Sequence, residues 1–159
     1  MKAAVLTVSD GVANGTREDE SGDALAELLA GEGYDIVRRV VPDERDAIAS
    51  ALRELAADAR VVLTTGGTGL AARDVTPEAT EEVVERKVPG IAEAIREVSR
   101  AKTPHGLLSR GVAGAVGTTL VVNLPGSPGG CRDGFQVLRP ALAHAVELLA
   151  GEPTAHRQT

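Results

Sequence analysis

Short apolar runs alternate with amphipathic segments along most of this chain of 159 residues. Runs rich in β-branched residues predict strands over residues 3–9, 34–41, 60–65, 112–116 and 119–124. The run at 60–65 is apolar at its centre, so we expect both faces of that strand to be covered. The pattern therefore places buried strands at regular intervals, with room for helices between them.

The segments between these runs predict helices. Their expected first residues or caps are Ser21, Asp43, Thr76 (with Pro77 in the first helical position), Ile91 and Ser127. Pro140 lies inside the last helical region and predicts two short helices or a kink there. Residues 10–20 and 103–111 are expected to be irregular.

Strands that alternate with helices predict an α/β fold, a three-layer sandwich with a mostly parallel central sheet flanked by helices. We expect a single domain over residues 1–150 and a frayed tail over 151–159. Ligands of such sheets bind beyond the carboxyl ends of the strands. Unusual loops at 10–20, 66–75 and 125–130 each follow a strand, so we expect them to form one site if those strands are neighbours.

Composition narrows the classes of function. Aromatic residues make up only 1% and the net charge is −6, which argues against a nucleic-acid partner. Cys131 is the only cysteine, so neither an intrachain disulfide nor a cysteine-based zinc site is possible. The chain start lacks a signal-peptide pattern, and no apolar run approaches the ~20 residues that span a bilayer. We expect a cytoplasmic protein without a membrane partner.

A glycine-rich bend follows the third predicted strand and contains Gly66, Gly67 and Gly69. Glycines let backbone N–H groups converge into a concavity that attracts anions, although a plain glycine turn is the simpler alternative. Residues 67–72 also match G-x-G-x-x-A, the dinucleotide fingerprint. That motif needs a helix to start inside it, whereas the expected helix begins only at Thr76. We therefore favour a phosphate-binding loop.

Two aspartates are candidate metal ligands. Asp74 follows the glycine bend and is a hard oxygen ligand of the kind that Mg²⁺ prefers, although it could instead form a solvated pair with Arg73. Asp43 stands where a helix cap belongs, and its local context favours a cap. The two roles are compatible, because a capping carboxylate beyond a strand end can also face a ligand.

Two further segments lie at predicted strand ends. Ser127 and Pro128 are typical of a helix start, and their glycine neighbours leave that helix N-terminus open to an anion. Ser9 and Asp10 end the first strand, where they could bind a ligand or merely form a turn. For both segments the structural and the functional interpretation remain open.

These segments together resemble the MogA/MoaB family of molybdenum-cofactor biosynthesis, whose fold also occurs in the G domain of gephyrin. The matching pieces are Val8–Gly11, Asp19–Gly22, Val41–Glu44, Thr64–Glu78 and Asn123–Pro128. They span most of the chain, and the glycine bend with its Arg-Asp pair is the most specific of them.

The resemblance implies that ATP and molybdopterin are the substrates of an adenylyl transfer to the terminal phosphate of molybdopterin, with release of pyrophosphate. It also implies Mg²⁺, a homotrimer and a molybdate-inserting enzyme as a downstream partner. Asp43 and Asp74 would be the catalytic and metal-holding carboxylates. The implied substrate- and nucleotide-binding residues are Ser9, Asp10, Thr65, Gly66, Gly67, Thr68, Gly69, Arg73, Asn123, Pro125, Gly126 and Ser127.

One position departs from the family pattern. Gly129 stands where the family often has a lysine, so a phosphate-binding cation is either missing or supplied by Arg73 or Arg132. Two alternatives to the transferase stay open: a non-catalytic molybdopterin-binding module of the same fold, and a nicotinamide dehydrogenase built on the G-x-G-x-x-A match.

Overall fold

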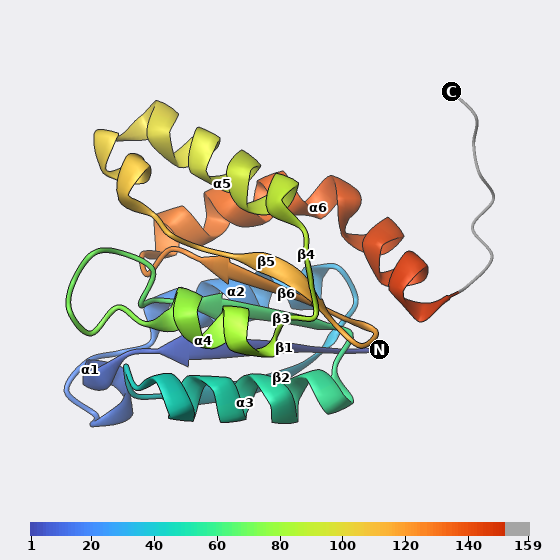
Figure 1. Cartoon of the computed structure of the whole chain (residues 1–159), viewed down its shortest axis with the longest axis horizontal. Coiled ribbons are helices and arrows are strands. Elements are labelled where there is room, and N and C mark those ends of the chain that lie inside the picture. Colours follow the sequence, from blue (N-terminus) through green and yellow to red (C-terminus); the bar gives the residue numbers. More distant parts are fainter. Residues whose placement is uncertain (152–159) are drawn as a thin grey trace.

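A six-stranded sheet with the strand order β2-β1-β3-β6-β5-β4 forms the centre of the chain (Figure 1). The structure is a computed structural model that describes residues 1–151. The strands are β1 (Lys2–Val8), β2 (Asp35–Val41), β3 (Val61–Thr65), β4 (Arg86–Lys87), β5 (Ala113–Val116) and β6 (Thr119–Leu124). β2, β1, β3 and β6 are parallel, whereas β5 runs antiparallel to both β6 and β4. The predicted mostly parallel sheet is confirmed.

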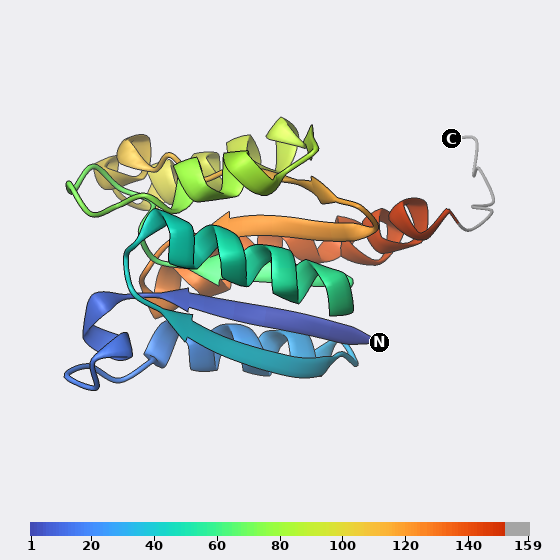
Figure 2. The same cartoon turned by 60° about the horizontal axis from the view of Figure 1, so that its bottom comes forward.

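Helices cover both faces of this sheet, so the predicted three-layer α/β sandwich is also confirmed. The helices are α1 (Asp10–Ala13), α2 (Glu20–Gly31), α3 (Arg45–Asp58), α4 (Thr76–Val83), α5 (Pro89–Lys102) and α6 (Pro128–Ala150), with a 3-10 helix at Pro104–Leu108. α3 and α4 pack on one face, and α2, α5 and α6 pack on the other (Figure 1 and Figure 2). No helix within residues 1–151 is long and apolar enough to cross a membrane.

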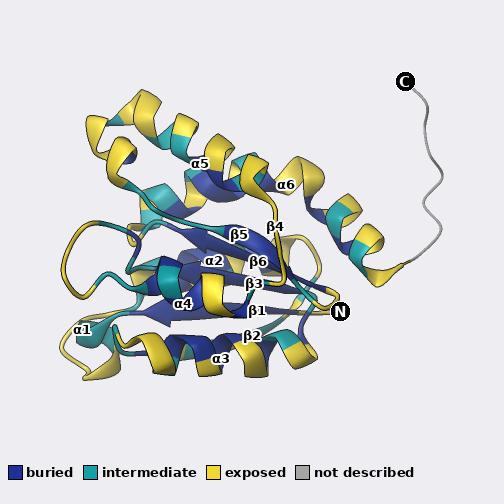
Figure 3. Ribbon diagram, viewed as in Figure 1, coloured by how far each residue is buried: buried dark blue, intermediate teal, exposed yellow. Residues whose placement is uncertain are grey.

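The core consists of two apolar layers, one on each side of the sheet. Along β1, Ala3 and Val5 belong to the layer under α2 and α6, while Ala4 and Leu6 belong to the layer under α3. This alternation follows from the two-residue period of a strand. Every residue of β3 is buried, as predicted, and exposed positions lie mainly on the outer sides of the helices (Figure 3). The sheet is thus a buried support for the loops at its carboxyl edge.

Three short elements were not predicted. Residues 10–20 contain α1, a single turn whose cap is Ser9, and residues 103–111 contain the 3-10 helix. β4 is only two residues long and exposed, and it exists through its pairing with β5. Such short elements show no hydrophobic periodicity in the sequence, because a cap or a partner strand stabilises them rather than the burial of an apolar face.

The starts of α2 and α4 differ from the prediction. The cap of α2 is Asp19, whose Oδ1 accepts a hydrogen bond from the Gly22 N–H at 3.0 Å. Ser21 instead donates its hydroxyl to the carbonyl oxygen of Gly126 at 2.7 Å. Thr76 does not cap α4 either, because its hydroxyl donates to the carbonyl oxygen of Gly66 at 2.9 Å. Both hydroxyls bind distant loops rather than their own helix.

α6 continues through Pro140 as one helix of 23 residues. Of the two predicted outcomes, the pair of short helices is therefore wrong, while a kink at Pro140 stays a prediction. Buried side chains on both sides of the proline, including Leu138 and Leu142, pack into the same core layer. This burial on either side offsets the single backbone hydrogen bond that proline removes. Residues 152–159 of the expected frayed tail lie outside the described residues.

Candidate active site

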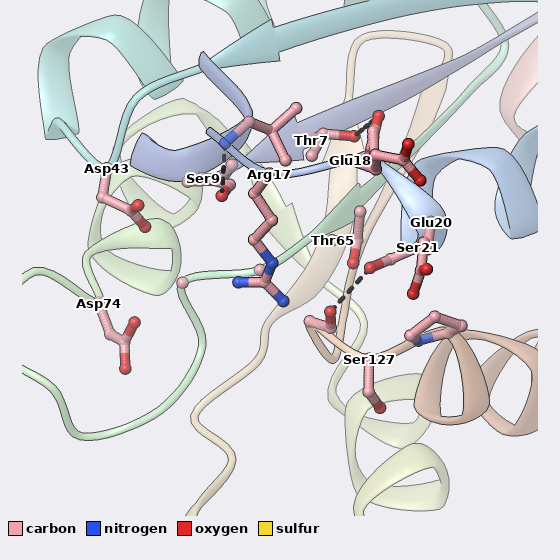
Figure 4. A pocket seen from close by; sticks show the side chains of 17 residues that line it. Thr7, Ser9, Arg17, Glu18, Glu20, Ser21, Asp43, Thr65, Asp74 and Ser127 are labelled. Atoms are coloured by element: carbon pink, nitrogen blue, oxygen red, sulfur yellow. Dashed lines mark hydrogen bonds between the residues drawn. The ribbon is translucent and has the colours of Figure 1, made fainter. Parts of the chain in front are cut away.

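The three loops that follow β1, β3 and β6 meet at one edge of the sheet, as predicted. β3 lies between β1 and β6, so the carboxyl ends of these parallel strands are adjacent. The loops border a cavity of about 760 Å³ (Figure 4). Its lining residues are Thr7, Val8, Ser9, Val12, Arg17, Glu18, Asp19, Glu20, Ser21, Asp43, Thr65, Gly66, Gly67, Asp74, Gly126, Ser127 and Pro128.

Glycine is required where the bend after β3 passes its neighbours. Gly66 and Gly67 have φ values of +97° and +69°, which side chains rarely adopt. A Cβ atom at Gly66 would lie 2.2 Å from the carbonyl oxygen of Val8. At Gly67 it would lie 2.3 Å from Thr76 Oγ1 and 3.3 Å from Asp43 Oδ1. The bend therefore runs directly against one of the two candidate carboxylates.

The bend is not a dinucleotide-binding turn. α4 begins at Thr76, well beyond residues 67–72, so no helix N-terminus meets the motif. The nicotinamide-dehydrogenase alternative consequently lacks the geometry on which it depends.

Asp43 is not a helix cap, which corrects the local prediction. Glu44 occupies the N-cap position of α3 and makes no side-chain cap bond. Asp43 Oδ2 accepts from the Asp10 N–H at 2.8 Å, and Asp10 Oδ1 accepts from the Asp43 N–H at 3.0 Å. This reciprocal pair fixes the end of β1 to the end of β2 and turns the Asp43 carboxylate toward the cavity (Figure 4).

The pKa of Asp43 is raised above its ordinary value of 3.8. Burial is the main cause, and the carboxylates of Asp10 and Asp74 raise the pKa further, while the Asp10 N–H opposes the shift. A carboxylate in such surroundings is stabilised by a cation more strongly than an isolated surface carboxylate is.

Asp10 and Arg73 form an ion pair beside the cavity. Arg73 Nε lies 2.6 Å from Asp10 Oδ2, and its Nη2 lies 2.9 Å from Asp10 Oδ1. The guanidinium lowers the pKa of Asp10, and the hydrogen bond from the Asp43 N–H adds to this effect. Both side chains are thus engaged with each other, and they join the loops after β1 and β3 without lining the cavity.

Asp74 is oriented by its own loop. Its Oδ2 accepts from the Ala71 N–H at 3.0 Å, and a Cβ atom at Gly69 would lie 2.9 Å from the same oxygen. Asp74 lines the cavity together with Asp43, and Figure 4 shows the two carboxylates on the same side of it.

Arg110 holds this loop from outside the cavity and was missed by sequence reasoning. Its Nε donates to the carbonyl oxygen of Gly69 at 2.9 Å, and its Nη2 donates to that of Asp74 at 2.7 Å. Its backbone N–H donates to the carbonyl oxygen of Thr68 at 2.9 Å, and its Nη1 pairs with Glu78. An arginine at the end of an irregular segment gives no sequence signal for such contacts.

The hydroxyls of Ser9 and Ser127 act as helix caps at the cavity wall. Ser127 Oγ accepts from the Gly130 N–H at 3.1 Å, and Ser9 Oγ accepts from the Val12 N–H at 3.2 Å. The predicted start of α6 at Ser127 is confirmed. The N-terminal end of this long helix faces the cavity. Pro128 has no N–H and the Gly130 N–H is bonded to Ser127, so the helix dipole and the N–H of Gly129 are what favour an anion there.

Asn123 is a buried structural residue in this structure. Its Nδ2 donates to Thr64 Oγ1 and to Thr80 Oγ1, both at 3.0 Å, and its Oδ1 accepts from the Val112 N–H at 3.1 Å. The whole amide is therefore engaged within the protein, and Asn123 can influence a ligand only through the loop that it supports.

Eight of the fourteen implied site residues line the cavity: Ser9, Asp43, Thr65, Gly66, Gly67, Asp74, Gly126 and Ser127. The other six, which lie beside or beneath it, are Asp10, Thr68, Gly69, Arg73, Asn123 and Pro125. The pyrrolidine of Pro125 is set back, while its carbonyl oxygen accepts from Thr65 Oγ1 at 2.7 Å. The implied site residues left out Arg17 to Ser21, although residues 10–20 were placed at this edge and Asp19–Gly22 was one of the matching pieces.

The donor set fits Mg²⁺ when a phosphate ligand shares it. The described residues hold no cluster of three or more His, Cys, Asp or Glu side chains suited to a metal, so protein ligands alone would not enclose an ion. Mg²⁺ is commonly bound by one or two carboxylates together with substrate phosphates and water. Asp43 and Asp74 supply two such carboxylates.

Comparison with known proteins shows the family of this chain. Residues 4–144 match the family model described as a probable molybdopterin binding domain. The molybdopterin adenylyltransferase of Helicobacter pylori strain 26695 is 39% identical over 152 residues, covering 92% of this chain and 86% of the relative. The molybdenum cofactor synthesis protein cinnamon of Drosophila melanogaster is 41% identical over 160 residues, covering 98% of this chain but only 26% of that longer protein. Among solved structures, the molybdopterin biosynthesis enzyme MoaB of Thermus thermophilus is 47% identical, with a TM-score of 0.88 and coverage of 96% and 98% of the two chains.

Proposed function

This chain belongs to the molybdopterin-binding domain family of molybdenum-cofactor biosynthesis, and we propose that it is a molybdopterin adenylyltransferase. In the proposed reaction a terminal phosphate oxygen of molybdopterin forms a bond to the α-phosphorus of ATP. The bond between that phosphorus and the oxygen bridging to the β-phosphate breaks, and pyrophosphate leaves. The pterin phosphate is itself the nucleophile, so no protein side chain needs to attack.

One observation carries this proposal: the cavity gathers two carboxylates, a glycine bend and a helix N-terminus from loops at adjacent strand ends. Transfer between two phosphate-bearing substrates depends mainly on positioning and on charge neutralisation. The bend at Gly66 and Gly67 would present backbone N–H groups to phosphate oxygens, and the start of α6 would add its dipole and the N–H of Gly129. Because the sheet and the helix caps already hold these groups in place, little reorganisation is needed when the ligands bind.

Asp43 and Asp74 would hold the Mg²⁺ ion in this proposal. When bound, the ion supplies positive charge that draws the substrate phosphates together and stabilises the leaving pyrophosphate. The protein orients the two carboxylates independently: Asp10 fixes Asp43, while Ala71 fixes Asp74. Each carboxylate therefore reaches the cavity from a different strand end.

The experiment is an assay of pyrophosphate release and adenylylated pterin formation from purified protein, Mg²⁺, ATP and molybdopterin. We expect Asp74→Asn to melt like the wild type and to lose turnover by about 10²-fold or more, because it removes a charge on which phosphate positioning depends. Asp58→Asn is the matched control, since Asp58 is an exposed partner of Lys2 at 2.7 Å. Full turnover in Asp74→Asn would remove the metal-holding role of Asp74.

A non-catalytic molybdopterin-binding module is the second candidate. The description of the matching family model favours it, because that description names a probable molybdopterin binding domain and no reaction. Tight molybdopterin binding by the wild type without any release of pyrophosphate would establish this alternative over the transferase.

We also propose a homotrimer on the strength of family membership. Light scattering coupled to size exclusion should then give a mass about three times that of the 16.3 kDa chain. A monomer mass across the micromolar range would contradict this proposal.

A further inference from the structure

Arg17 is the only positively charged residue among those that line the cavity within the described chain. We infer that its guanidinium binds a phosphate group of the substrates, and this inference rests on the proposed function. The same lining contains the acidic residues Glu18, Asp19, Glu20, Asp43 and Asp74. A bound Mg²⁺ would compensate Asp43 and Asp74, and Arg17 is the side chain in the lining whose charge would offset the repulsion of phosphate by Glu18 and Glu20.

The two arginines expected to supply this charge do not reach the cavity. Arg73 is held by both carboxylate oxygens of Asp10, at 2.6 and 2.9 Å. Arg132 lies on the exposed side of α6 and is absent from the cavity lining. Gly129 carries no side chain at all. The positive charge that Gly129 cannot provide would therefore come from Arg17, in the loop after β1.

The guanidinium of Arg17 is available for a ligand. It makes no ion pair within 4.0 Å and no side-chain hydrogen bond with any residue that the structure describes, despite the acidic surroundings. Asp19, two residues further along the chain, pairs with Arg38 at 2.8 Å and not with Arg17. The planar donor fork of an arginine matches two oxygens of one phosphate.

Local structure directs Arg17 into the cavity. Gly15, with a φ of +79°, reverses the chain after α1, and the Arg17 N–H donates to the carbonyl oxygen of Gly11 at 3.1 Å. A Cβ atom at Gly11 would lie 3.2 Å from the Cβ of Arg17, so the absence of a side chain there makes room for the arginine stem. In Figure 4 the guanidinium of Arg17 lies in the middle of the lining residues, with Asp43 on one side of it and Ser127 on the other.

This placement gives Arg17 a distinct task. The glycine bend and the dipole of α6 act on a ligand from the sheet edge, whereas Arg17 offers its donors from the loop after β1. A phosphate between them would be contacted from two sides. The chemistry is the same for the triphosphate of ATP and for the terminal phosphate of molybdopterin, so experiment must distinguish the two.

The test compares wild type with Arg17→Gln and Arg17→Lys by calorimetric titration in Mg²⁺ buffer. The probes are ATP, inorganic pyrophosphate, molybdopterin and adenosine, which lacks phosphate. Arg86→Gln is the matched control, because it removes one exposed arginine charge on β4, outside the cavity. Thermal melting verifies the fold of each variant, and an exposed substitution of this kind should shift stability little.

We expect Arg17→Gln to weaken at least one phosphate-bearing probe by about 10- to 100-fold, with adenosine unaffected. Arg17→Lys should be intermediate, since it keeps the charge but loses the fork. Weaker binding of ATP and pyrophosphate would assign Arg17 to the nucleotide, and weaker binding of molybdopterin alone would assign it to the pterin phosphate. In the turnover assay, the KM for the assigned substrate should rise. Unchanged affinities for all three phosphate ligands would overturn the inference. A wild type that binds these ligands but releases no pyrophosphate would refute the transferase and leave this binding test intact.

Discussion

Asp43 carries its charge in surroundings that oppose ionisation. Burial and two neighbouring carboxylates raise its pKa, and the N–H of Asp10 compensates only in part. The folded protein therefore binds a proton at Asp43 more tightly than the unfolded chain does, so ionisation of this group costs stability at neutral pH. Such a cost is typical of a site that is completed by a ligand.

Asp43→Asn should therefore be more stable than the wild type and much less active. We expect its Tm at pH 7.5 to be higher by about 1 to 4 °C, the range of an ordinary stabilising change in a domain of this length. The difference should shrink as the pH falls through the raised pKa of Asp43, because the wild-type carboxyl then becomes neutral. Melting curves of both proteins from pH 7.5 to pH 4 measure this difference in Tm.

Asp46→Asn is the control for Asp43→Asn, since Asp46 lies in the first turn of α3, close to Asp43 in sequence but outside the cavity. A lower Tm for Asp43→Asn at neutral pH would show that the carboxylate stabilises the fold rather than serving a ligand.

The conformation of the bend after β3 depends on glycine at position 67. Its φ of +69° and the close approach of Thr76 Oγ1 leave no room for a side chain. We expect Gly67→Ala to lower the Tm and to reduce phosphate affinity by about 10-fold or more, because the bend must move away from Asp43. Gly31→Ala in α2, where a Cβ meets nothing within 4 Å, is the matched control. Wild-type affinity and Tm in Gly67→Ala would contradict this account.

At the scale of elements, the loop from Gly66 to Val75 depends on a residue far along the chain. Arg110 comes from the segment before β5, yet it binds the carbonyl oxygens of Gly69 and Asp74 and pairs with Glu78. Burial raises the pKa of Glu78, but the hydrogen bonds from Arg110 and from the Glu78 backbone N–H, together with the charge of Arg110, outweigh burial and lower the pKa overall. The loop that presents Asp74 is thus held by side-chain contacts rather than by regular structure.

Arg110→Met should loosen this loop while the sheet stays folded. We expect turnover to fall by about 10- to 100-fold, as is common when a residue that orients a ligand-binding group is lost. Amide hydrogen exchange of residues 66–75 should rise, and the pKa of Glu78 should return toward or above its ordinary value. Arg96→Met is the control, because Arg96 donates to the carbonyl oxygen of Gly111 at 2.8 Å and not to the loop. Unchanged exchange in Arg110→Met would show that the loop is ordered without the arginine.

At the scale of the whole molecule, the site exists because β1, β3 and β6 are neighbours in the sheet. Direct contacts tie their loops together, among them the ion pair of Asp10 with Arg73 and the hydrogen bond from Ser21 to Gly126. A ligand that touches all three loops should therefore stabilise the entire fold and not one element.

Mg²⁺ with ATP should raise the Tm of the wild type. At a hundred times Kd the added stability is about 2.7 kcal/mol, which corresponds to about 5 to 10 °C in a domain of this length. The shift should be smaller with EDTA in place of Mg²⁺, and smaller again in Asp43→Asn and Asp74→Asn. An equal shift with and without Mg²⁺ would argue against a metal shared by protein and phosphate.

Much of this protein follows from the sequence alone. Apolar runs rich in β-branched residues predicted the five longer strands. Their alternation with amphipathic segments predicted the mostly parallel sheet and the helices on both of its faces. The glycines at 66 and 67 and the start of α6 at Ser127 were likewise visible, since their chemistry is local. These features needed no knowledge of distant neighbours.

Tertiary structure decided what each polar side chain does. Asp43 resembled a cap until its contact with Asp10, 33 positions away, became visible, and Asn123 resembled a ligand-binding residue until its amide proved to be fully bonded inside the fold. Arg17 lines the cavity, whereas Arg73 does not, because Arg73 is bound to Asp10. Neither outcome could be read from neighbouring residues in the sequence. A polar group can bind either a ligand or the protein, and that choice depends on which partners the folded chain brings within about 3 Å.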